Sequence, residues 1–164
     1  PLAWKTRLID FGKGEKLATT IPWGDISTAF YTTNIPNIEV YIPISPKKLS
    51  ILKRANYIRW ILGLSFIQSV LKKKAAEQRG PSIEQFNNQL TYIWGEAKNA
   101  QGKSKTVRIT TANGYALTVV SSLEITEYLL KNKVKGGYRT PSQLMGSDFI
   151  TGLPGYSEEL NGDR

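Results

Sequence analysis

Two periods of hydrophobic and polar residues alternate along the chain, one typical of strands and one typical of helices. The strand-like runs are residues 2–10, 15–22, 37–42, 91–98 and 105–112. Residues 11–14 contain Gly12 and Gly14 and separate the first two runs, which predicts a hairpin. Residues 99–102 form a similar turn cluster between the last two runs.

The helical spacing of apolar residues predicts four helices, at 25–31, 46–79, about 115–131 and about 143–153. Asp25 is the predicted N-cap of the first, and Pro46 takes the favoured first position of the second. The second helix has an expected irregularity at Gly63 and ends before Gly80 and Pro81. The order predicts an α+β fold, with a mixed, largely antiparallel sheet of about five strands and helices packed on one face.

The size of the chain fits one ordinary domain, because 164 residues are enough to bury a substantial core. We expect this domain to cover residues 1–155 and the polar residues 156–164 to form a frayed tail. The chain begins with Pro1 instead of Met, and we expect it to be part of a longer protein.

The composition excludes several kinds of catalytic site, because the chain has no cysteine and no histidine. Serine–histidine–aspartate triads, cysteine–histidine dyads and sulfur- or imidazole-based metal sites are therefore ruled out. We expect no metal site, and the sequence identifies no catalytic residue. A phosphate-binding glycine loop is also not expected, because Gly12-Lys13-Gly14 lacks a third glycine and lies in a predicted hairpin.

The net charge of +9 is concentrated in one segment. Residues 46–79 contain nine basic side chains and one acidic side chain, whereas the rest of the chain contains 13 basic and 12 acidic ones. Inside this segment, the twelve residues 60–71 carry no charge. The predicted helix is therefore both strongly basic and strongly apolar.

The uncharged stretch is too short to span a bilayer, which takes about 20 apolar residues. Its apolar side chains occupy nearly the whole circumference of the helix, so a second surface is needed to cover them. We expect that surface to be protein, with a homo-oligomer formed through helix 46–79. An anionic membrane surface is the alternative. Nucleic acid is not expected, because the basic residues surround an apolar block and no recognised binding motif is present.

Candidate ligand-binding residues lie at three predicted helix starts. Asp25, between Trp23-Gly24 and Ser27-Thr28, either caps its helix or marks a helix N-terminus that faces a cleft and holds an anionic group. Arg139 before Thr140 either binds a carboxylate or phosphate or is a surface residue before a capping threonine. Tyr115 offers a hydroxyl to a ligand or packs at the start of its helix.

Several runs of residues resemble the saccharopine dehydrogenase-like oxidoreductases, in the part that follows their nucleotide-binding domain. The longest run is residues 21–41, IPWGDISTAFYTTNIPNIEVY. The others are GYALT at 114–118, GYRTPS at 137–142 and GSDFI at 146–150. They occur in the same order as in the family, and with the strands between them the resemblance covers most of residues 2–155.

The resemblance implies a two-domain protein, in which an N-terminal Rossmann domain binds NAD or NADP and this chain forms the following substrate-side and dimerisation domain. The candidate substrate-binding residues, which we expect to border the cleft between the two domains, are Trp23, Gly24, Asp25, Thr28, Tyr115, Arg139 and Thr140. We expect this chain to bind no cofactor and to be inactive alone, with its own Rossmann domain as partner. A non-catalytic interaction or membrane-surface module that uses helix 46–79 is the alternative. We expect a cytoplasmic location, and the basic, apolar helix 46–79 suggests association with a membrane as the alternative.

Overall fold

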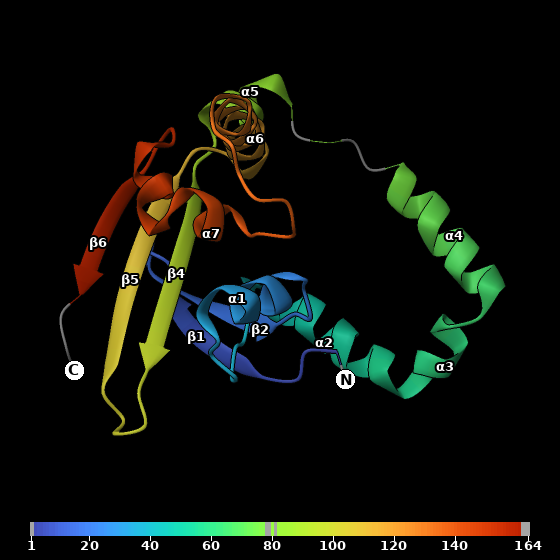
Figure 1. Cartoon of the computed structure of the whole chain (residues 1–164). Coiled ribbons are helices and arrows are strands. Elements are labelled where there is room, and N and C mark those ends of the chain that lie inside the picture. The colour runs from blue at the N-terminus through green and yellow to red at the C-terminus, as the bar shows by residue number, and fades with distance from the viewer. Residues whose placement is uncertain (1, 78–79, 81, 162–164) are drawn as a thin grey trace.

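A computed structural model of the chain describes residues 2–77, 80 and 82–161 and confirms the α+β class (Figure 1). The seven α-helices and two 3-10 turns of the described residues are α1 (Asp25–Thr33), α2 (Pro46–Ala55), η1 (Asn56–Ile58), α3 (Arg59–Leu62), α4 (Ser65–Ala76), α5 (Ile83–Asn88), α6 (Gly114–Lys131), α7 (Pro141–Met145) and η2 (Ser147–Gly152). The strands are β1 (Thr6–Asp10), β2 (Glu15–Thr20), β3 (Tyr41–Pro43), β4 (Thr91–Lys98), β5 (Ser104–Thr111) and β6 (Ser157–Asn161).

The prediction of a single sheet of about five strands is wrong, because the described residues form two separate antiparallel sheets of three strands each. The first has the order β1-β2-β3, with Leu8 opposite Leu17, and the second has the order β4-β5-β6, with Ile93 opposite Ile109. Each hairpin forms as the turn residues predict. Gly12 and Gly14 have positive φ between β1 and β2, and Gly102 has positive φ between β4 and β5.

Within the segment 156–164, where the sequence predicts a frayed tail, residues Ser157–Asn161 form the strand β6. Gly155 has a φ of 74°, and a Cβ atom there would lie 2.6 Å from the Ala112 nitrogen. The Ala112 amide donates to the Pro154 carbonyl at 2.9 Å. This close turn places β6 along the free edge of β5, whose backbone groups give the polar residues a partner that their own pattern does not reveal.

The predicted helix 46–79 is broken into α2, η1, α3 and α4. Its start is as predicted, with Ser45 as N-cap and Pro46 in the first turn. The first break is at Asn56, whose side chain bonds both the amide and the carbonyl of Leu2 at 2.7 and 2.9 Å. The second is the turn at Gly63, as the sequence suggests. The predicted end at Arg79 and Pro81 lies outside the described residues.

Smaller differences occur in the other elements. The strand predicted at 37–42 is reduced to β3, and the helix predicted at 143–153 is divided into α7 and η2 around Gly146, which has a φ of 92°. The sequence prediction misses α5, although Ser82 and Gln85 form a complete capping box at its start.

Side chains, instead of backbone hydrogen bonds, join the two sheets. The Arg7 guanidinium on β1 donates to both carboxylate oxygens of Glu96 on β4, at 3.0 and 2.7 Å, and lies 4.8 Å from the centre of the Trp94 ring. In the opposite direction, Arg108 on β5 donates to the Asp10 carbonyl on β1 at 2.8 Å and pairs with its carboxylate at 3.3 Å. Two arginines therefore set the relative position of the sheets.

The buried apolar core is small for a chain of this length. Among the described residues, the buried apolar side chains are Ala3, Ile9, Ala18 and Leu153. The accessible surface is 12768 Å², whereas a compact monomer of this size exposes about 8,100 Å². No helix within the described residues has the length and apolar content needed to cross a bilayer. Much apolar surface is thus available for contact with another molecule or domain.

We expect the Arg7–Glu96 pair to contribute about 1 kcal/mol of coupling energy to the stability of the fold. Bidentate geometry strengthens the pair, but its side chains are 45% and 24% exposed, so water screens part of the attraction. A double-mutant cycle with R7A and E96A, followed by urea unfolding, measures this coupling. The matched control is Glu127–Lys131, an exposed pair within α6, which should give a smaller value. Equal coupling in both pairs would contradict a special role for the contact between sheets.

Stability should also fall in acid because of two carboxylates at this junction. Hydrogen bonds from Lys5 and then Tyr41 lower the pKa of Glu39, and hydrogen bonds from Arg7 lower the pKa of Glu96. A carboxylate whose pKa in the folded protein lies below its unfolded value of 4.5 stabilises the fold fully above pH 4.5. This stabilisation is lost as the pH falls from there through the lowered pKa. Urea midpoints measured from neutral to acidic pH should therefore decline less in E39Q/E96Q than in the exposed-carboxylate control E77Q/E84Q. An unchanged decline would remove these carboxylates from the acid response.

Candidate functional site

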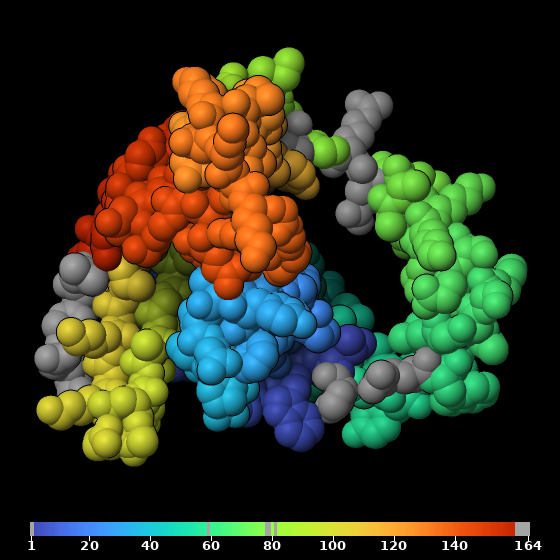
Figure 2. All heavy atoms as spheres, in the orientation of Figure 1, coloured from blue at the N-terminus to red at the C-terminus, as the bar shows by residue number. Residues whose placement is uncertain are grey.

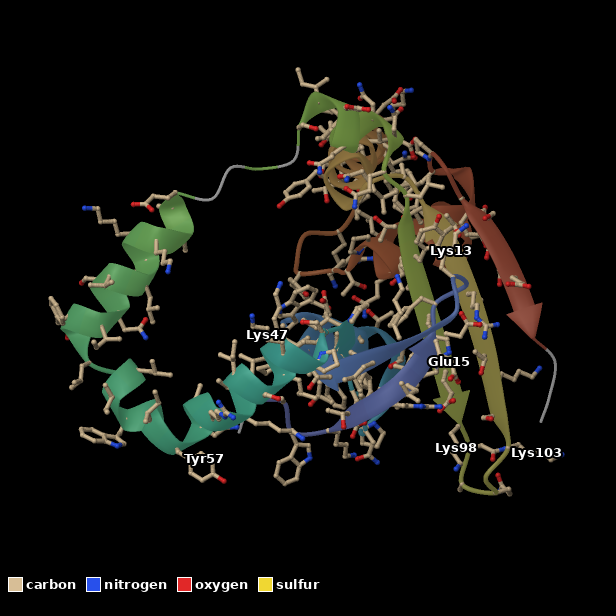
Figure 3. All side chains as sticks on the ribbon, turned by 180° about the vertical axis from the view of Figure 1, so that it is seen from behind. Lys13, Glu15, Lys47, Tyr57, Lys98 and Lys103 are labelled. Atoms are coloured by element: carbon tan, nitrogen blue, oxygen red, sulfur yellow. The ribbon has the colours of Figure 1, made fainter. Side chains whose placement is uncertain are left out.

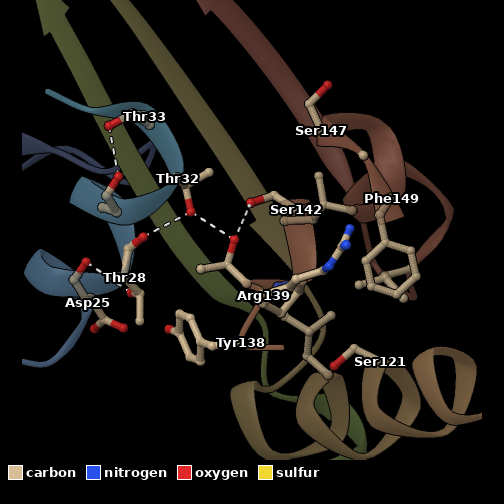
Figure 4. A pocket seen from close by; sticks show the side chains of 17 residues that line it. Asp25, Thr28, Thr32, Thr33, Ser121, Tyr138, Arg139, Ser142, Ser147 and Phe149 are labelled. Atoms are coloured by element: carbon tan, nitrogen blue, oxygen red, sulfur yellow. Dashed lines mark hydrogen bonds between the residues drawn. The ribbon is translucent and has the colours of Figure 1, made fainter. Parts of the chain in front are cut away.

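A pocket of about 800 Å³ lies between α1, α6 and the segment from Tyr138 to Leu153 (Figure 4). Its walls come from parts of the chain far apart in sequence, because α1 lies between β2 and β3 of the first sheet and residues 138–153 lead into the last strand of the second. Its charged, hydroxyl and aromatic side chains include Asp25, Thr28, Thr32, Tyr138, Arg139, Thr140, Ser142 and Phe149.

The pocket brings together four of the seven predicted site residues: Asp25, Thr28, Arg139 and Thr140. Trp23 lines a second hollow of about 650 Å³ between the two sheets, and Asp25 borders both. Gly24 immediately precedes Asp25 as the N-cap of α1.

Tyr115 lies away from the other predicted site residues. It borders a separate hollow of about 450 Å³ near Gln89 and Thr118. The start of its helix is capped by Asn113, whose side chain accepts the Tyr115 amide at 3.0 Å. The structure therefore gives Tyr115 no part in the pocket that the other four residues share.

Three hydroxyl groups on the pocket wall form one chain of hydrogen bonds that runs from α7 to α1. Thr32 donates to the Thr28 carbonyl at 2.9 Å and lies 2.8 Å from the Thr140 hydroxyl. Because a hydroxyl has one hydrogen, Thr140 must donate to Thr32. Ser142, 3.3 Å from Thr140, must then be the donor of that third bond. All three hydrogens are used, so the free capacity of Ser142 is its lone pairs, which accept a donor from a ligand.

Thr140 is the centre of this chain and the predicted cap of α7. Its side chain accepts the Gln143 amide at 3.3 Å, while the Gln143 side chain accepts the Thr140 amide at 3.0 Å. The same glutamine donates to the Tyr31 carbonyl at 2.7 Å. The capping box therefore also ties α7 to α1, and the 4% exposed Thr140 is held from both sides.

The charged groups lie on opposite sides of the pocket. In Figure 4, Asp25 lies at the start of α1, the Arg139 guanidinium points towards Phe149, and Tyr138 lies between Asp25 and Arg139. Within the described part of the chain, neither charged side chain has an ion-pair partner. Both are therefore available to a ligand with a positive or hydrogen-donating group at one end and an anionic group at the other.

The prediction that Asp25 caps α1 is wrong. Gly24 is the N-cap and makes no side-chain bond, and Asp25 is the first helical residue. The Ile26 and Ser27 amides already donate to the Trp23 and Gly24 carbonyls, at 3.2 and 2.9 Å. With these two amides used and a carboxylate beside them, the helix start is poorly suited to an anion. Arg139 is the better anion-binding group.

Sequence reasoning did not select Thr32, Tyr138, Ser142 or Phe149 as site residues. A signal for Thr32 exists: Asp25, Thr28 and Thr32 follow the i, i+3, i+7 spacing of one helix face. Tyr138 was selected only as part of a family-like run, although it closes one side of the pocket and contacts Tyr31 edge to face at 6.1 Å. Its role depends on a contact across more than 100 residues, which no local pattern reveals.

The described residues contain no group of three or more His, Cys, Asp or Glu side chains placed to hold a metal ion. Gly12 and Gly14 form the β1–β2 turn, and all four strand pairings are antiparallel, unlike the strand–loop–helix unit that binds a pyrophosphate. No protein-family model, curated protein or solved structure matches the chain. The chemistry of the pocket itself therefore carries the functional argument.

We expect T140V to destabilise the fold by about 1–2 kcal/mol, because it removes a cap and breaks a buried hydroxyl chain without changing the shape of the side chain. Urea unfolding measures the loss. T126V is the control, because the Thr126 hydroxyl bonds only the Ser122 carbonyl of its own helix. If T140V cost no more than T126V, the chain of hydroxyls would not hold α1 and α7 together.

Proposed function

We propose that this chain is the substrate-side domain of a saccharopine dehydrogenase-like oxidoreductase, and that its 800 Å³ pocket forms one wall of the substrate cleft. The observation that carries the proposal is the meeting of the family-like runs. Residues 21–41 supply α1, and 137–142 and 146–150 supply the opposite side of the same pocket. Leu117, from 114–118, lines it as well. Runs that are separate in the sequence thus converge on one place.

The side chains of the pocket suit recognition better than chemistry. Arg139 would bind an anionic group of the substrate, Asp25 and Ser142 would accept hydrogen bonds from its donors, and Tyr138 and Phe149 would cover its apolar part. With no histidine or cysteine in the chain, no side chain has an ordinary pKa near neutrality for proton transfer. Binding and orientation are the functions that this set can perform.

The redox chemistry would come from NAD or NADP bound elsewhere in the protein, because the Gly12–Gly14 turn joins two antiparallel strands and not a strand and a helix. The proposed partner is an N-terminal Rossmann domain of the same protein, which would complete the cleft from the open side of the pocket. Exposed Tyr138 and Arg139 would then be covered when the two domains meet. The chain alone would bind substrate weakly and would not turn it over.

In the proposed two-domain protein, we expect D25A and R139A each to lower kcat/KM by roughly 10- to 100-fold, the range for a lost hydrogen bond to a charged group. NAD(P)H oxidation with a panel of carbonyl compounds that carry a carboxylate measures the effect. Thermal unfolding should barely change, because both side chains are exposed. The matched controls are E84A and R54A, which lie outside the pocket.

Wild-type turnover by both pocket variants would remove them from the substrate site. The coding sequence upstream of Pro1 tests the wider proposal. A strand–GxGxxG–helix unit there supports the oxidoreductase class, and an unrelated domain or a stop codon overturns it.

A further inference from the structure

Residues 57–77, here called the arm, leave the body of the protein after the Asn56–Leu2 contact. Figure 1 shows α3 and α4 on the far side of an open space from α6, and Figure 2 shows that their atoms stand apart from the body. Among the described residues, α3 contacts η1 and α4, and no comparable contact joins α3 or α4 to either sheet. The arm is thus a helical projection with little tertiary contact.

The arm exposes large aromatic side chains that a soluble surface normally covers. Tyr57, Phe66 and Trp60 are 86%, 75% and 74% exposed. Figure 3 shows Tyr57 pointing away from the body. Ile58, Leu64, Val70 and Leu71 are exposed along the same short segment. Scattered exposed apolar residues are ordinary, but a group of this size within 15 residues marks a contact surface.

The charge around this apolar group is almost entirely positive. Residues 46–77 contain eight basic side chains and one acidic side chain, Glu77. Lys72, Lys73 and Lys74 follow directly on the apolar residues of α4, and none of the lysines of α2 and α4 is in an ion pair within the described residues. Packing two arms together would place like charges side by side. An anionic surface complements them.

We propose that the arm docks on the surface of an anionic lipid bilayer. Trp60, Phe66 and their apolar neighbours enter the interfacial layer, and Lys72–Lys74 contact the lipid headgroups. Tryptophan and tyrosine favour this layer because their rings are amphipathic. The arm lies on the bilayer without crossing it. The inference is independent of the proposed pocket function and adds a location to it.

The bend between α3 and α4 suits this environment. The Leu64 amide donates to the Ile61 carbonyl at 3.0 Å, and the Gln68 side chain donates to the Leu62 carbonyl at 2.5 Å. These bonds occupy backbone groups that the break in the helix would otherwise leave unpaired. Unpaired backbone groups are costly beside the acyl chains.

Vesicle co-sedimentation of the 164-residue chain tests the proposal, using phosphatidylcholine vesicles with and without phosphatidylserine. We expect binding to the phosphatidylserine vesicles at low salt and release at high salt. K72Q/K73Q/K74Q should lower the partition coefficient roughly 100-fold, since each basic residue near an anionic surface contributes roughly a factor of five. W60S/F66S should lower it at least about tenfold by removing buried apolar surface.

Two matched variants control for general effects. K98Q/K103Q/K105Q gives the same loss of charge at the β4–β5 hairpin, where Figure 3 shows Lys98 and Lys103 far from the arm. L130S removes another largely exposed apolar side chain, on α6. Both should bind vesicles like the wild type. Circular dichroism should show that every variant keeps the wild-type fold, because all the altered side chains are exposed.

Tryptophan quenching by lipids with brominated acyl chains locates the contact. Wild-type fluorescence should be quenched on binding, whereas W60F should bind with much less quenching, although Trp4, Trp23 and Trp94 remain. Absence of binding to phosphatidylserine vesicles at low salt overturns the proposal. So does an equal loss in both lysine triples, which indicates unspecific attraction. A concentration-dependent dimer that W60S/F66S abolishes, without vesicle binding, overturns it in favour of a second copy of the chain.

Discussion

The contact of two separate sheets through arginine side chains is the constraint on which the rest of the structure depends. Arg7 reaches from β1 to Glu96 on β4, and Arg108 reaches from β5 back to Asp10. The helix α1 connects β2 to β3 of the first sheet, and residues 138–153 precede the last strand of the second. The pocket exists because this contact brings α1 against α7, where Thr32 and Thr140 then bond.

Local patterns in the sequence predict most helices and strands, and the wrong predictions share one physical cause, which is pairing with residues distant in the chain. The hairpins follow from turn glycines and alternating residues, and the start of α2 follows from Ser45 and Pro46. The arrangement of sheets and the strand β6 depend on partners distant in the chain, because a strand needs an edge to pair with. At the break at Asn56, the Asn56 side chain likewise bonds a partner more than 50 residues away, Leu2.

The candidate site shows the same division. Asp25 and Thr28 share a helix face, and Thr140 is a cap that Gln143 three residues later makes recognisable, so each residue could be selected locally. The meeting of residues 25–28 and Thr140 at one pocket, although they are more than 100 residues apart, does not follow from periodicity. Only the family resemblance places these residues at one cleft. Tyr115 shows the limit of this reasoning, because a capped helix start resembles a ligand site in sequence yet lies beside a different hollow.

The division of the pocket between two sheets has a mechanical consequence. A ligand that contacts Asp25 on one side and Arg139 on the other is also a crosslink between the two halves of the fold. Anything that binds only the assembled state stabilises it by mass action. Because the buried apolar core is small, a bound ligand would supply a large share of the interactions between the two halves of the fold. Without a ligand, a few polar side-chain contacts hold these halves together.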